Sequence, residues 1–121
     1  MLRVAAGFFL VLHGVISAAI WIPPQRGAKM PGFGSQASWL FAGVRPAVIT
    51  LALVAASGFV FSGAAYLAQS PWWAPVGILA ATASLALITT TFTPWWSVAI
   101  IINAVIIYAA WDTTVVQLSA R

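Results

Sequence analysis

Four long apolar runs dominate the sequence, and they restrict the fold more than any other feature. The runs cover residues 4–22, 46–68, 72–92 and 95–116. Each is long enough for an α-helix to cross a hydrocarbon core, which requires about 20 residues. Inside a bilayer only helices and closed barrels satisfy every backbone hydrogen bond, and runs of this length fit helices. The sequence therefore predicts an all-α polytopic membrane protein, an antiparallel four-helix bundle forming one domain over residues 1–121.

The segments between these runs predict how the helices are connected. Pro23 and Pro24 end the first run, because proline cannot continue a helix. The polar segment 23–45 is rich in Gly, Pro and Ser, which indicates a loop in water or at the membrane surface. The later connections are only a few residues long, and such tight turns make consecutive helices antiparallel neighbours.

Charge is scarce, and its scarcity excludes several classes of function. The 121 residues carry five cationic side chains, one acidic side chain and no cysteine. The cations are scattered, so nothing supports nucleic-acid binding, and the lipid bilayer is the expected partner. The sequence also holds no thiolate nucleophile, zinc-ligand spacing, Walker loop or pair of carboxylates. We expect no catalytic residue, no metal site and no enzyme activity from the chain alone.

Seven tryptophans lie near the ends of the apolar runs. Membrane proteins place tryptophan at both membrane–water interfaces, where one part of the ring contacts lipid and another contacts water. Counting along antiparallel helices assigns four tryptophans to one face and three to the other, and we expect all of them to act as interface anchors. The first group is Trp21, Trp39, Trp95 and Trp96, and the second is Trp72, Trp73 and Trp111.

Polar side chains within the runs are the places where specific chemistry is expected. His13 lies near the middle of the first run and Asn103 near the middle of the last. Along their helices, Arg3 lies about 15 Å from His13 and Asp112 about 13.5 Å from Asn103, because an α-helix rises about 1.5 Å per residue. If the first and last helices are neighbours, we expect two polar pairs: Arg3 with Asp112 near the termini, and His13 with Asn103 near the midplane.

His13 has three interpretations. It can be a packing residue with satisfied hydrogen bonds, it can contact a small ligand such as a quinone, or it can ligate the metal of a haem or another pigment. The sequence contains one histidine, so a haem held by two histidines would require a second chain. His13 and Asn103 are the candidate cofactor-binding residues, and the cofactor class stays open between quinone and pigment.

Asp112 and the hydroxyl side chains also allow more than one interpretation. Asp112 can couple to protons, as carboxylates in membrane pumps do, or it can anchor the helix near the interface. Tyr108 lies one turn before it and is a candidate hydrogen-bond partner. Four hydroxyl residues either face inward or bond the backbone of their own helix. These residues are Thr50, Ser57, Thr82 and Thr89.

The first run resembles the start of DoxX-like small four-helix integral membrane proteins. Arg3, Gly7 and the pair His13-Gly14, in the stretch LRVAAGFFLVLHG, are similar to an arginine, a glycine and a His-Gly pair that recur along the first helix of that family. The four-helix layout, the longer first loop and the asparagine in the last run extend the resemblance to the whole chain. Some members are membrane subunits of quinone-linked oxidoreductases, so the resemblance implies a small subunit near quinone chemistry.

Together these features predict a small non-catalytic integral membrane subunit that anchors or assembles a larger membrane complex, with a quinone-linked or redox complex as one option. The alternatives are a small homo-oligomeric transporter or channel, and a quinone- or pigment-binding protein that uses His13. Four-helix multidrug exporters of this length rely on a glutamate in the first helix, and this sequence has no glutamate. We expect a multi-pass location in a prokaryotic plasma membrane, with other membrane subunits or further copies of the chain as partners.

Overall fold

The described part of the protein is a bundle of four α-helices. The computed structural model describes residues 1–21, 45–90 and 97–119, and every element in these residues is helical. This confirms the predicted all-α fold. The predicted anchors Trp39, Trp95 and Trp96 lie outside the described residues. The helices are α1 (Leu2–Trp21), α2 (Arg45–Leu67), α3 (Trp73–Thr90) and α4 (Ser97–Ser119).

All four helices are long and apolar enough to cross a membrane. Their mean hydropathy lies between 1.5 and 2.0, and the shortest has 18 residues. Much of α1 and α4 is not buried inside the bundle. In water these apolar side chains would be exposed to solvent. A lipid environment accounts for such faces, because hydrocarbon chains solvate them.

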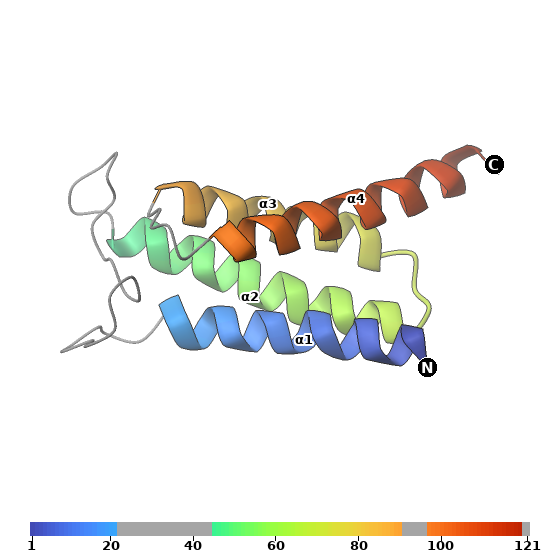
Figure 1. Ribbon diagram of the computed structural model, residues 1–121, viewed down its shortest axis with the longest axis horizontal. Coiled ribbons are helices and arrows are strands. Elements are labelled where there is room, and N and C mark those ends of the chain that lie inside the picture. Colours follow the sequence, from blue (N-terminus) through green and yellow to red (C-terminus); the bar gives the residue numbers. More distant parts are fainter. Residues whose placement is uncertain (22–44, 91–96, 120–121) are drawn as a thin grey trace.

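The helices pack in the order of the sequence. α1 packs on α2, α2 on α3 and α3 on α4, whereas α1 and α4 are not among the closely packed pairs. Figure 1 shows α2 between α1 and α3, with the C-terminal half of α4 diverging from the N-terminal end of α1. The first and last helices are therefore not packed closely on each other, although the two predicted polar pairs required it. Short connections favour contacts between consecutive helices, whereas α1 and α4 are far apart in the sequence.

Close backbone contact between α1 and α2 depends on glycine. A Cβ atom on Gly14 would lie 2.7 Å from the carbonyl oxygen of Ala56, and one on Gly63 would lie 2.7 Å from the carbonyl oxygen of Gly7. Backbone atoms cannot move aside as a flexible side chain can. Small residues permit this approach, which replaces the hydrophobic driving force that is missing between helices in lipid.

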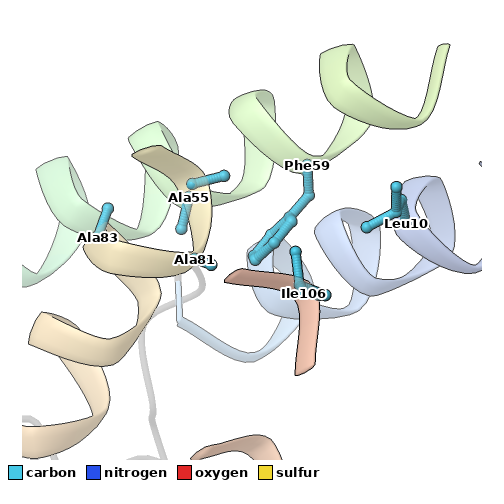
Figure 2. Close-up of a cluster of buried hydrophobic side chains, with 7 residues drawn as sticks. Leu10, Ala55, Phe59, Ala81, Ala83 and Ile106 are labelled. Atoms are coloured by element: carbon cyan, nitrogen blue, oxygen red, sulfur yellow. The ribbon is translucent and has the colours of Figure 1, made fainter. Parts of the chain in front are cut away.

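Phe59 is the largest of the fully buried side chains. It is fully buried and belongs to a cluster with Leu10 of α1, alanines of α2 and α3, and Ile106 of α4. Figure 2 shows its ring lying between the helices, near Ile106. Most of its other partners are alanines, so one aromatic ring on α2 fills much of the space that the other helices leave.

Trp21 is a core residue rather than an exposed anchor. It is only 8% exposed and packs with Val48, Ala52, Leu87 and Ile88 in a second cluster near the end of α1. At the other end of the bundle, Trp72 and Trp111 are exposed, and Trp73 is half-buried with its ring edge-to-face on Tyr66. The exposed positions suit the predicted interface role, whereas Trp21 is covered because the ends of α2 and α3 converge on it.

The hydroxyl side chains of the second and third runs bond their own helices. Each of these residues is exposed and donates to the carbonyl oxygen four residues earlier, at 2.6–2.9 Å. Such bonds hide the hydroxyl from lipid without a partner helix. Of the two interpretations, the inward-facing one is wrong and the backbone-bonded one is confirmed. The residues are Thr50, Ser57, Thr82 and Thr89.

Candidate functional site

A cleft opens sideways between α1 and α4, where the bundle does not close. Its volume is about 320 Å³, and α3 lies behind it. Most of its lining is apolar, and the polar exceptions are the side chains of His13, Ser17 and Ser84, with Trp21 at one end. The chief apolar lining residues are Phe9, Leu12, Ile16, Ile88, Val98 and Ile102. In a bilayer this opening faces lipid, so a ligand would enter from the membrane.

His13 lies in the wall of the cleft and is fixed by two aromatic rings. Phe9, one turn earlier on α1, stacks on the imidazole with a centroid distance of 5.9 Å. Phe59 contacts it edge-to-face from α2 at 4.7 Å. The imidazole is therefore held by packing rather than by a polar network. Its Nε2 atom is buried and has no hydrogen-bond partner among the described residues.

Asn103 is fully buried between α4 and α3. Its amide nitrogen donates to the Ser84 hydroxyl at 3.1 Å and to the Ala99 carbonyl oxygen at 2.8 Å. Its Oδ1 atom is buried and, like Nε2 of His13, has no partner among the described residues. Ser84 and Ala99 both line the cleft, so Asn103 supports the wall from behind rather than forming its surface.

The predicted pairing of His13 with Asn103 is replaced by a different arrangement. Asn103 bonds Ser84 on α3, because α3 is the helix against which α4 packs. The two residues still flank the same cleft, one directly and one through its bonding partners. Their spacing along the sequence predicts similar depths in the bundle. They do not bond because the two helices that carry them are not packed closely together.

The predicted pairing of Arg3 with Asp112 is also replaced. The Arg3 guanidinium faces the side-chain amide of Gln69, at the end of α2. Asp112 is exposed on α4 and does not line the pocket that contains Arg3. Tyr108 is exposed as well, and within the described helices no hydrogen bond joins it to Asp112. α4 lines the pocket of Arg3 through Gln117 instead.

Three residues of the site were not identified from the sequence. Ser84 bonds Asn103, Phe59 holds the His13 ring, and Ser17 lines the cleft. Ser17 donates its proton to the carbonyl oxygen of His13 at 2.8 Å, which leaves its oxygen able to accept. The four-residue spacing of His13 and Ser17 on one helix face is a signal that could have indicated Ser17. Nothing local indicates Phe59, which reaches the site from another helix.

The chemistry of the cleft suits a ring-shaped polar head on an apolar body. A neutral imidazole nitrogen donates to a carbonyl in one tautomer and accepts from a hydroxyl in the other. Ligand sites usually measure about 300–1,000 Å³, so this cleft is at the small end and suits a single ring better than a four-ring macrocycle. Within the described residues no three acidic or imidazole ligands gather as a metal site would require.

These features define the class of the protein. Four apolar helices, each able to span a bilayer, make it a small multi-pass integral membrane protein. Comparisons of the chain with protein-family models, curated proteins and solved structures found no match. The DoxX-like resemblance therefore stays a prediction from the sequence.

Proposed function

We propose that the protein is a non-catalytic membrane subunit that binds a quinone-like amphiphile in the cleft between α1 and α4, in a prokaryotic plasma membrane. The observation that carries this proposal is His13, which lines an apolar cleft and whose buried Nε2 has no partner among the described residues. A buried polar atom without a partner costs about 1–3 kcal/mol, so its retention in a small apolar chain suits a ligand that completes the bond.

The shape of the cleft supports an amphiphile rather than a water-soluble ligand. The opening faces the space that lipid tails fill, and its lining is apolar apart from a few groups. A quinone carbonyl would accept from Nε2, and the hydroxyl of the corresponding quinol would donate to it. One imidazole thus serves both forms, and no acid or base of the chain takes part in the chemistry.

Purification of the protein in mild detergent also distinguishes the other predicted roles from this one. A subunit of a larger complex would co-purify with other membrane chains in mild detergent. A transporter or channel would show solute or ion flux after reconstitution, and a pigment-binding protein would be coloured. Specific partners would extend the proposal, because a quinone-binding subunit normally serves a larger redox complex.

Titration of the purified protein with decylubiquinone tests the proposal. Quinones quench tryptophan fluorescence, and Trp21 lines the end of the cleft. We expect saturable quenching that weakens about tenfold in His13→Leu, because one hydrogen bond contributes about 1.4 kcal/mol. Thr50→Val is the matched control, since it removes a polar atom from an exposed position outside the cleft. Equal quenching in the wild type and His13→Leu would contradict the proposal.

A further inference from the structure

A second pocket lies at the end of the bundle where α1 begins and α2 ends. It measures about 260 Å³ and is considerably more polar than the cleft. Among the described lining residues, Arg3 is the cation, Pro71 is apolar, and the others offer amide, hydroxyl or indole groups. These others are Tyr66, Gln69, Ser70, Trp73 and Gln117.

The charge of this pocket is unbalanced. Arg3 contributes a guanidinium, and no carboxylate is among the lining residues that the structure describes. Asp112, the acidic side chain of the chain, lies outside the pocket. The partner of Arg3 is the side-chain amide of Gln69, which is neutral. With the amide oxygen turned toward the guanidinium, this oxygen accepts hydrogen bonds from Arg3. An amide satisfies donors without neutralising charge, so the pocket retains a net attraction for an anion.

The backbone at Gln69 points to a role for its side chain. α2 ends in a Schellman motif, in which Ser70 N–H bonds the Ala65 carbonyl oxygen at 2.9 Å and Gln69 N–H bonds the Tyr66 carbonyl oxygen at 3.2 Å. Gln69 has φ 58°, a left-handed conformation that favours glycine. This position holds glutamine despite that preference, and the glutamine amide is the group that faces Arg3.

An apolar groove continues from this pocket along the bundle. It measures about 180 Å³, and it shares Tyr66 and Trp73 with the polar pocket. Its walls come from α1 and α4, and Phe9 belongs both to it and to the cleft at His13. The remaining lining is Ala6, Leu10, Val105, Ile106 and Ala109. A cationic pocket and an apolar groove thus lie next to each other, with Tyr66 and Trp73 bordering both.

We infer that the pocket around Arg3 binds the phosphate of an anionic lipid, and that an acyl chain of this lipid lies in the groove between α1 and α4. Guanidinium donates two parallel hydrogen bonds to a phosphate, and the neutral groups around it supply further ones. Trp72, Trp73 and Tyr66 place this end of the bundle at the level of lipid head groups, where such aromatic rings concentrate. The inference is independent of the ligand at His13.

Lipid-dependent stabilisation of the full chain in mild detergent tests the inference. The unfolding temperature is measured against increasing phosphatidylglycerol, and against phosphatidylcholine of the same acyl length, which carries no net charge. A ligand that binds the folded state raises this temperature as its concentration exceeds its Kd. We expect phosphatidylglycerol to bind at least about fivefold more tightly, since one cation near anionic lipid contributes about that factor. Equal effects of the two lipids would overturn the inference.

Two variants assign the preference to the pocket. Arg3→Gln should abolish the preference for phosphatidylglycerol, whereas Arg45→Gln, which removes the same charge at the opposite end of α2, should keep it. Gln69→Gly should retain or raise the unfolding temperature without lipid, because glycine suits φ 58°, and yet weaken phosphatidylglycerol binding. This variant stays informative even if Arg3→Gln fails to fold. A Gln69→Gly protein with unchanged lipid binding, or an Arg45→Gln protein that also loses the preference, would contradict the assignment.

A measurement with inorganic phosphate distinguishes binding of a lipid from binding of a free anion. We expect phosphate alone to stabilise the protein far less than phosphatidylglycerol does, because it makes no contact in the groove. Ala109→Phe, which fills the groove, should weaken phosphatidylglycerol binding, whereas Ala104→Phe at an exposed position of α4 outside the groove should not. Stabilisation by phosphate equal to that by the lipid, with no effect of Ala109→Phe, would overturn the lipid part of the inference.

Discussion

The amide nitrogen of Asn103 donates to the hydroxyl of Ser84 at 3.1 Å, joining α4 to α3 inside the core. This bond lies behind the wall of the cleft, because Ser84 also lines it. Asn103 is fully buried, and α3 is the helix on which α4 packs. The bond therefore helps to fix the position of α4 against α3, behind the wall of the cleft.

Removal of this bond should destabilise the bundle. We expect Asn103→Ala to lower the free energy of unfolding by about 1–2 kcal/mol, from the lost bond and the space it leaves. The measurement is denaturant unfolding in mild detergent, followed by helical content. In a double-mutant cycle with Ser84→Ala, the coupling should be about 0.6 kcal/mol, typical of bonds between membrane helices. Thr82→Ala, at an exposed position that bonds its own backbone, is the control and should change little. Strict additivity would contradict the account.

Close contact between α1 and α2 should not tolerate a methyl group at Gly14. The added Cβ would lie 2.7 Å from the Ala56 carbonyl oxygen, so the helices would have to separate. We expect Gly14→Ala to cost about 1–3 kcal/mol of stability, as overpacking usually does. Ala19→Val adds carbon atoms to an exposed position of the same helix and should be nearly neutral. Thermal unfolding in detergent measures both, and equal unfolding temperatures would show that the helices are not in this contact.

The substitution Ser62→Ala should remove the destabilising effect of Gly77→Ala. The Ser62 hydroxyl donates to the Trp73 carbonyl oxygen at 2.7 Å, joining α2 to the start of α3. A Cβ on Gly77 would lie 2.9 Å from this hydroxyl oxygen but 3.9 Å from the Ser62 Cβ. Gly77→Ala alone should therefore destabilise the protein by about 1 kcal/mol. In a Ser62→Ala background the same change should cost nothing, because the obstructing atom is gone. A constant cost of Gly77→Ala in both backgrounds would exclude this contact.

The fold was predictable because its causes are local. The sequence itself shows the hydrophobic runs of membrane-spanning length, the proline at the end of the first run and the short connections. The depth of His13 and Asn103 was predictable for the same reason, since helix rise is constant. Their partners were not, because partners depend on which helices touch. The glycine contacts and the Phe59 ring set that order, and each involves residues far apart in sequence.

The burial of Trp21 illustrates the same limit. A tryptophan at the end of an apolar run is expected at the interface, and Trp72 and Trp111 are exposed as that rule predicts. Trp21 is instead covered by residues of α2 and α3, which no local pattern around it indicates. Similarly, scarcity of charge suggested that Arg3 and Asp112 would pair. In the structure Arg3 instead has a neutral partner, Gln69, and lines an open pocket.

The most direct test of the account concerns His13, measured with and without ligand. Because Nε2 has no partner among the described residues, His13→Leu should leave the free energy of unfolding of the ligand-free protein unchanged, or raise it by up to about 1 kcal/mol. Decylubiquinone should then stabilise the variant as much as the wild type only at about tenfold higher concentration, because its binding is about tenfold weaker. A His13→Leu protein that is markedly less stable without ligand, and that responds to the quinone as the wild type does, would contradict the account.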